Sequence, residues 1–231
     1  SIDGQLLCAN NNGALLIEEN RTVKILDSNG YFSFKKIPND PNHIVGANYN
    51  GFAIFEKNSS GWKFLNQISG FDKPSNSFEI DASYLWLKKD GLIYQMEISK
   101  DLTKFNSIKT HKNLSNSIKG IGSIQTIKNA VYFQTNNHFY KYSQDQDRFF
   151  EDTKISALFK NLPKIHALSE DALGNIWYVF KESLGMLSKI SNDKYTNIVV
   201  PFSFSSGNLV NNYLSINTID SKNTFIGLTD G

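Results

Sequence analysis

The sequence predicts an all-β fold, a β-propeller of four-stranded antiparallel blades, and three observations lead to that prediction. Short apolar stretches rich in β-branched and aromatic residues recur along the 231 residues, each followed by a polar turn and a second such stretch. These hairpins repeat at nearly regular distances, and no sustained helical period separates them. A repeat of about 40 to 50 residues with four strands per unit is typical of propeller blades.

The turns of the hairpins give the blade count. They align at Gly13, Gly51, Gly91, His138, Gly185 and Gly231, which are 38, 40, 47, 47 and 46 residues apart. We therefore expect one propeller region over residues 1–231, with approximate blades at 1–27 (partial), 28–72, 73–112, 113–160, 161–200 and 201–231 (partial). Four complete and two partial blades indicate a partial ring, cut from a larger propeller of about seven blades.

Two smaller features complete the structural expectations. Residues 151–162 ("EDTKISALFKNL") are the helical candidate, and we interpret them as a short turn or loop. In "NSSGWKF", Gly61 leads directly into Trp62, as expected where a third strand turns back into a fourth.

Composition and charge exclude several functions. The 24 Lys and Arg residues and 22 Asp and Glu residues give a net charge of +2 and are scattered, which argues against a nucleic-acid surface. The single cysteine, Cys8, excludes an internal disulfide, and we interpret it as a buried strand residue and not a reactive thiol. The four histidines show no metal-ligand spacing, so we predict no metal and no cofactor.

The stretch "SEDALGNIW", residues 169–177, has two interpretations. Its adjacent carboxylates could belong to a reaction centre, or the stretch could be a turn. Looser copies at Asp3, Asp81 and Asp220 favour the turn, because a catalytic site would occur once. We expect Asp171 to accept hydrogen bonds from backbone amides, Gly174 or Asn175 to take a positive φ, and Trp177 to pack between blades. No catalytic residue is predicted.

The turns between the second and third strands are the candidate ligand sites. Hairpin geometry alone accounts for the turn residues Asn12, Asn50 and Asp90, since Asn-Gly and Asp-Gly turns need positive φ. Alternatively, these turns share the face where blade-connecting loops meet the central channel, and their side chains bind a polar ligand such as a saccharide. The candidate binding residues are Tyr49, Lys89, Asn136 and Lys181.

Residues 165–187, "IHALSEDALGNIWYVFKESLGML", resemble the repeat of the two-component regulator propellers. The shared pattern is an apolar strand, Glu-Asp, Gly-Asn-Ile-Trp, a further strand and a Gly-Leu step. "INTIDSKNTFIGLTDG" and "SIDGQLLCANNNGALLI" are weaker copies. The chain departs from the pattern at His138, which replaces the turn glycine, and in two additional residues between Trp177 and Gly185.

The resemblance implies a non-catalytic sensor in the periplasm, as the extracytoplasmic part of an inner-membrane regulator. It also implies a polysaccharide-derived ligand and, downstream in the parent chain, a β-sandwich and a membrane-linked output domain, either a histidine kinase or a LuxR-type DNA-binding domain. The region itself would bind no nucleic acid, and signalling across a membrane favours a homodimer. Two alternatives stay open on the same fold: a carbohydrate-active enzyme (glycoside hydrolase or lyase) and a protein-interaction scaffold.

Overall fold

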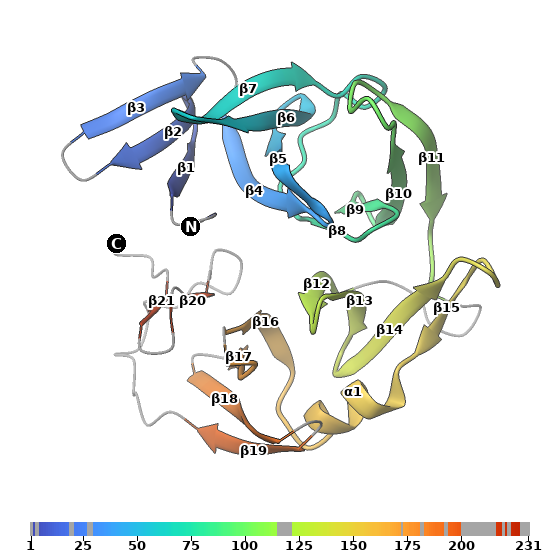
Figure 1. Ribbon diagram of the computed structural model, residues 1–231. Coiled ribbons are helices and arrows are strands. Elements are labelled where there is room, and N and C mark those ends of the chain that lie inside the picture. Colours follow the sequence, from blue (N-terminus) through green and yellow to red (C-terminus); the bar gives the residue numbers. More distant parts are fainter. Residues whose placement is uncertain are drawn as a thin grey trace. The chain divides into compact units, whose positions relative to one another are not determined.

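The computed structural model describes residues 2, 5–18, 21–26, 30–114, 122–171, 173–180, 183–191, 194–199, 216–218, 220 and 223–226. The chain divides into two compact units, Ser1–Asn113 and Leu114–Gly231. Figure 1 labels the strands of each unit and the short helix. Every pairing between strands is antiparallel, and the strands of each sheet follow one another in chain order.

The first unit holds three sheets. Their strands are β1 (Leu6–Asn10), β2 (Gly13–Glu18) and β3 (Arg21–Leu26); β4 (Tyr31–Ile37), β5 (Asp40–Asn48), β6 (Gly51–Asn58) and β7 (Gly61–Gln67); and β8 (Phe78–Ile80), β9 (Leu85–Lys89), β10 (Leu92–Ile98) and β11 (Phe105–His111). The first strands of successive sheets contact one another, β1 with β4 and β4 with β8. The sheets therefore pack face to face, as the blades of a propeller do.

The second unit continues the pattern. Its strands are β12 (Ser123–Ile127), β13 (Ala130–Thr135), β14 (His138–Ser143) and β15 (Arg148–Glu151); β16 (Ile165–Glu170), β17 (Ile176–Phe180), β18 (Ser183–Ser191) and β19 (Lys194–Val199); and the pair β20 (Ile216–Thr218) and β21 (Thr224–Ile226). Strands β12, β16 and β20 again contact in succession. The helix α1 (Thr153–Phe159) lies in the connection between β15 and β16.

The fold is a β-propeller, as the repeat predicts, but the predicted blade count is wrong. Among the described residues, the strands form five antiparallel blades of the four-stranded type, and not four complete and two partial blades of a larger propeller. The prediction counted hairpins, so the strands near each chain end received a blade of their own. Because one blade can take strands from both ends of a chain, two incomplete hairpin groups are not evidence for two additional blades.

The core explains why the middle strands are apolar without interruption. In β6, the four residues from Phe52 to Phe55 are all fully buried, because the sheet packs against neighbours on both faces. The outer strand β11 instead buries its first residue, Phe105, and leaves the following residues mostly exposed. Cys8 lies on β1 as predicted, but it is half-buried and not buried.

The interpretation of residues 151–162 as a turn or loop is wrong, because they contain helix α1. Asp152 caps the helix, and its Oδ1 accepts a hydrogen bond of 3.1 Å from the backbone amide of Ile155. Phe159 is fully buried, and its ring centroid lies 4.6 Å from that of Phe139. A helix of seven residues depends on such tertiary packing, which periodicity does not reveal. Among the described residues, the structure contains no helix long and apolar enough to cross a membrane.

Candidate functional site

The turn at Asp171 is held together by the carboxylate of that residue. Oδ1 accepts hydrogen bonds from the backbone amides of Leu173 (2.9 Å) and Asn175 (2.8 Å), and Oδ2 accepts one from the indole nitrogen of half-buried Trp177 (3.1 Å). Gly174 takes the positive φ of 79°. Burial alone would raise the pKa of Asp171, but these hydrogen bonds, with one from the Asn175 side chain, outweigh it and lower that pKa. The carboxylate is therefore occupied in shaping the turn.

Related turns are built in the same way. Oδ1 of Asp81 accepts hydrogen bonds of 2.8 Å from two backbone amides, and Oδ2 accepts one of 2.7 Å from the indole nitrogen of Trp86. Asp220 accepts the backbone amide of Asn223 at 2.8 Å. Asp3 lies outside the described residues. Carboxylates that serve as hydrogen-bond acceptors for their own turns are poor candidates for acid or base catalysis.

The turns between second and third strands use two different geometries. Asp90 and Gly91 both have positive φ, 52° and 74°, as the hairpin explanation expects. In the β5–β6 turn, the positive φ lies on Gly51 (105°) and not on Asn50, whose backbone amide instead donates a 2.8 Å hydrogen bond to Oδ1 of Asn48. The β1–β2 turn repeats this second arrangement with Asn10, Asn12 and Gly13.

The four candidate binding residues come from separate turns. Tyr49 is 42% exposed, donates a hydrogen bond of 3.3 Å to Asn11 Oδ1 and packs on Phe32, with ring centroids 4.7 Å apart. Lys89 ends β9 and is half-buried. Asn136 lies in the β13–β14 turn of the second unit, and Lys181 lies outside the described residues.

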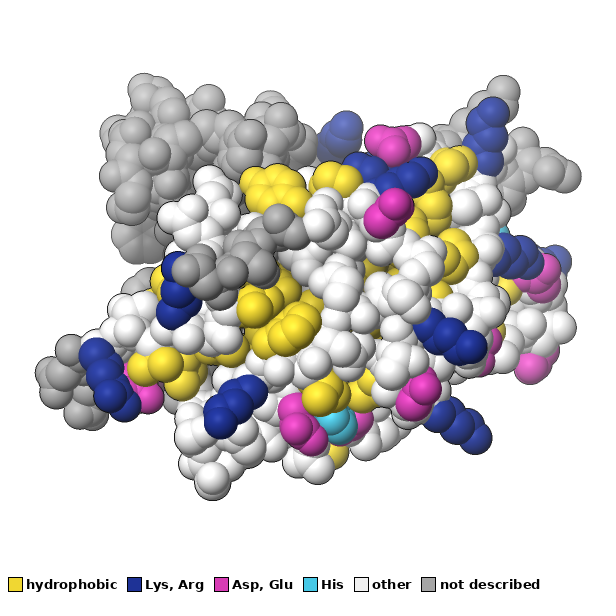
Figure 2. Space-filling model, turned by 90° about the horizontal axis from the view of Figure 1, so that it is seen from above, with side chains coloured by type: hydrophobic (Ala, Val, Ile, Leu, Met, Phe, Trp, Pro, Cys, Tyr) yellow, Lys and Arg dark blue, Asp and Glu magenta, His cyan; other side chains and the backbone are white. Residues whose placement is uncertain are grey.

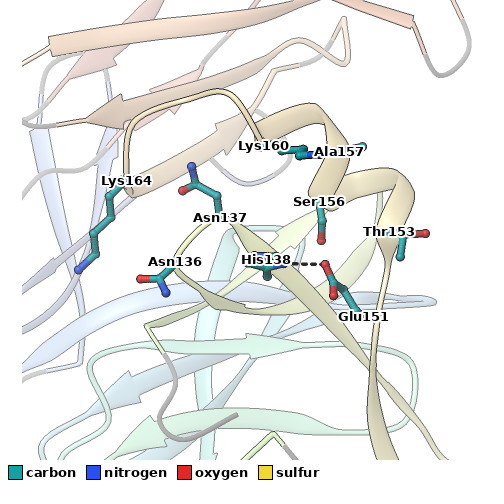
Figure 3. A pocket seen from close by; sticks show the side chains of 9 residues that line it. All are labelled: Asn136, Asn137, His138, Glu151, Thr153, Ser156, Ala157, Lys160 and Lys164. Atoms are coloured by element: carbon teal, nitrogen blue, oxygen red, sulfur yellow. Dashed lines mark hydrogen bonds and ion pairs between the residues drawn. The ribbon is translucent and has the colours of Figure 1, made fainter. Parts of the chain in front are cut away.

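A cavity of about 680 Å³ opens beside Asn136, between the β13–β14 turn and helix α1 (Figure 3). Its size falls in the range of about 300–1,000 Å³ that is usual for small-molecule sites. The residues that line it all belong to the second unit and are mostly polar: Asn136, Asn137, His138, Glu151, Thr153, Ser156, Ala157, Lys160 and Lys164.

Asn137 fixes one wall of this cavity to the other. Its Nδ2 shares its two hydrogens among the carbonyl oxygens of Phe159 (3.1 Å), Leu162 (2.7 Å) and Pro163 (3.2 Å), and its Oδ1 accepts a hydrogen bond from the amide of Ile165 (3.3 Å). The carbonyl oxygen of Phe159, the last residue of α1, also accepts a hydrogen bond of 3.0 Å from the amide of Leu162. One side chain in the turn therefore positions the whole segment after α1.

The histidine and the carboxylate of the cavity are already paired with each other. His138 Nδ1 lies 2.8 Å from Glu151 Oε1. The hydrogen bond from His138 contributes most to lowering the pKa of Glu151, against the opposing effect of burial. Ser156 Oγ accepts the backbone amide of Phe139 at 3.0 Å. Among the described residues Ser156 has no hydrogen bond to His138, whose Nδ1 is paired with Glu151, so the hydroxyl lacks the base that activates a serine nucleophile.

Other polar groups of the cavity remain available. Within the part of the chain that the structure describes, the side chains of Asn136, Thr153, Lys160 and Lys164 have no hydrogen-bond or ion-pair partner. The described residues contain no group of three or more His, Cys, Asp or Glu side chains that could hold a metal ion. On the molecular face in Figure 2, basic and acidic side chains are interspersed and not gathered by sign.

Sequence reasoning pointed to Asn136 but not to the rest of this cavity. Its other walls come from α1 and the segment after it, where the sequence predicts a short turn or loop over residues 151–162. Two signals were available: Asp152 three residues before Ile155, which fits a helix cap, and His138 in place of the glycine that the aligned hairpins share. Neither signal could show that α1 packs beside the β13–β14 turn.

No protein-family model and no curated protein matches the chain. Among solved structures, it is similar to two of the extracellular domain of BT4673, a one-component or hybrid two-component system of B. thetaiotaomicron. The first has a TM-score of 0.54 at 15% identity and covers 84% of this chain and 26% of that one. The second has a TM-score of 0.55 at 13% identity and covers 86% of this chain and 27% of that one. This chain thus spans about a quarter of the length of those domains.

A second similar structure is an enzyme. The catalytically inactive H270A form of virginiamycin B lyase from Staphylococcus aureus, with quinupristin, has a TM-score of 0.56 at 15% identity, over 99% of this chain and 75% of that one. At such identities the similarity shows the propeller fold alone. Propellers of this kind therefore include both extracellular domains of signalling systems and an enzyme.

Proposed function

We propose that this chain is the non-catalytic, ligand-binding propeller of an extracytoplasmic sensor in a bacterial two-component or membrane-bound transcriptional regulator. The observation that carries the proposal is the cavity beside α1, in which several polar side chains are available while His138 and Glu151 are paired with each other. The structural similarity to the extracellular domain of BT4673 supports the signalling setting. The resemblance of residues 165–187 to the two-component regulator propellers supports the same setting.

The cavity suits recognition of a saccharide fragment released from a polysaccharide. Amide, hydroxyl and ammonium groups are the side chains that hold sugar hydroxyl and carboxylate groups. Because Asn137 ties the β13–β14 turn to the segment after α1, the binding groups are held by a fixed backbone before any ligand arrives. Such preorganisation reduces the entropy lost on binding.

A catalytic role is the second candidate, since virginiamycin B lyase shares the fold over nearly the whole of this chain. The geometry gives it less support. Asp81 and Asp171 are occupied in turns, and His138 is paired with Glu151. Incubation with a polysaccharide panel, followed by detection of new reducing ends or unsaturated products, tests it; turnover that is lost in His138→Ala would replace our proposal with an enzyme.

The binding experiment uses two matched variants. Asn136 and Asn129 are both exposed asparagines at positive φ, 52° and 58°, but only Asn136 lines the cavity. Asn136→Gly and Asn129→Gly each remove a carboxamide without straining the backbone. In calorimetric titrations with a panel of oligosaccharides, we expect Asn136→Gly to weaken binding and Asn129→Gly to leave it unchanged. Binding that both variants retain in full would place the ligand elsewhere.

The signalling part of the proposal concerns the parent protein. We propose that a β-sandwich and a membrane-linked output domain, a histidine kinase or a DNA-binding domain, follow this propeller, and that paired propellers transmit the signal. The coding sequence of the parent gene tests this directly. A gene that encodes neither a membrane helix nor a regulatory domain after Gly231 would contradict it, and a protein-interaction scaffold would then be favoured.

A further inference from the structure

We infer that the ligand of the α1 cavity is an anionic glycan fragment, one whose sugars carry carboxylate or sulfate groups; this rests on the proposed function of the same cavity. The inference comes from the charges on the cavity wall. Two ammonium groups, those of Lys160 and Lys164, face no partner within the described residues, whereas the carboxylate of Glu151 is paired with His138. A ligand that neutralises the two ammonium groups is therefore anionic.

The two lysines come from one short stretch of chain. Lys160 is the C-cap residue of α1, and Lys164 lies four residues later, immediately before β16. The backbone between them is fixed, because Asn137 binds the carbonyl oxygens of Leu162 and Pro163. The two cations therefore extend from anchored points, although their side chains are flexible.

Neutral donors complete the site on both sides of the paired His138 and Glu151. Figure 3 shows Asn136 and Lys164 on one side of this pair and Thr153 on the other. An amide and a hydroxyl can bind sugar hydroxyls of any glycan, so they do not discriminate by charge. The lysines do, because a neutral sugar would desolvate them without supplying a counter-charge.

The contribution of each lysine is modest in water. An exposed ion pair changes an equilibrium about 2- to 5-fold, and this attraction falls as salt screens it. Loss of both ammonium groups is therefore expected to weaken binding about 10-fold, with most of the salt dependence removed. A site that depends on hydrogen bonds alone would show neither effect.

The probes are a galacturonate oligosaccharide, its carboxyl-reduced counterpart and a sulfated galactose oligosaccharide. The first two differ only in that each carboxylate has become a neutral alcohol, and the third distinguishes sulfate from carboxylate recognition. The variants are Lys160→Gln with Lys164→Gln, and the control is Lys154→Gln. Lys154 lies exposed on α1, has no partner among the described residues and does not line the cavity.

We expect an acidic probe to bind the unmodified protein, the double variant to bind it about 10-fold more weakly, and the control to match the unmodified protein in calorimetric titrations. If the carboxyl-reduced probe binds as strongly as the acidic probe, and Asn136→Gly weakens its binding, the inference is overturned and the proposed function stands. Acidic-probe binding that the double variant retains would also overturn it. If no probe of any charge binds, the inference and the proposed function fail together.

Discussion

The indole nitrogen of Trp86 donates a hydrogen bond of 2.7 Å to Oδ2 of Asp81, five residues earlier in the chain. Trp177 and Asp171, six residues apart, repeat the relationship at 3.1 Å. In both turns the other carboxylate oxygen accepts backbone amides. A single acidic side chain therefore joins the turn before a second strand to the aromatic residue on that strand.

Replacing Asp81 by alanine is expected to destabilise the protein by about 2–3 kcal/mol. The change removes the acceptor of two backbone amides and of the Trp86 indole, and Trp86 is 1% exposed. Urea denaturation followed by tryptophan fluorescence measures the loss. Asp72→Ala is the control: Asp72 is exposed and has no partner among the described residues, so we expect a change within about 0.5 kcal/mol. Equal stability of the two variants would contradict the role of Asp81.

Replacing Asn137 by alanine is expected to loosen the connection between β15 and β16. The side chain supplies hydrogen bonds to three carbonyl oxygens and accepts one from an amide, so we expect a loss of about 1–3 kcal/mol. Hydrogen exchange should accelerate over residues 153–165 and stay unchanged in β5 and β6. The neighbouring change Asn136→Gly should leave exchange unaltered, and equal acceleration in both variants would refute the assignment to Asn137.

The turn at Asp171 makes stability depend on pH. Its folded-state pKa is lowered, so its stabilising contribution is present above the unfolded pKa and is lost as pH falls through the lowered folded value. Asp171→Asn cannot ionise and cannot present two acceptor oxygens, so it should be less stable than the unmodified protein at pH 7 by about 1–2 kcal/mol. We expect this difference to shrink as the pH falls from about 5 to about 2. Urea midpoints across this range measure it, and a constant difference would contradict the ionised turn.

At Gly91 in the β9–β10 turn, the cost of backbone strain can be measured without any change in packing. A Cβ added at Gly91 would meet no atom within 4 Å, but φ is 74°. Gly91→Ala should therefore cost about 1 kcal/mol through the left-handed backbone alone, and Gly91→Asn should cost less because asparagine tolerates that region. Denaturation midpoints compare the two variants. Equal losses would mean that something other than φ limits this position.

The sequence determined the repeated elements well, because their signals are local. Glycines that mark hairpins and the aspartates that precede strands act within a few residues, and they predicted a propeller of four-stranded blades. The blade count depended on how strands group across the chain, which no local pattern records. Helix α1 was missed because its stability depends on Phe159 packing against Phe139, a contact between separate elements.

The same difference between local signals and contacts of separate elements applies to the candidate site. Aligning the hairpin turns predicts Asn136 as a binding residue, and Asn136 lines the cavity. Its role in binding stays a prediction. The sequence does not predict Lys160 and Lys164 as cavity residues. They line the same cavity as Asn136 because of the hydrogen bonds of Asn137 and the packing of helix α1. In the first unit, Tyr49 lies in the β5–β6 turn and Lys89 ends β9, and nothing in their sequence distinguishes a ligand contact from an ordinary hairpin.

The anchoring of the β15–β16 connection by Asn137 has a consequence for how this protein can diverge. The lysines of the cavity extend from a segment whose path is fixed by backbone carbonyls, and carbonyls are present whatever side chains the segment carries. Substitutions at 160 and 164 can therefore change the charge of the cavity while the blade sheets keep their sequences. Relatives that retain the asparagine but vary these two positions would form a series of receptors with one scaffold and different ligands.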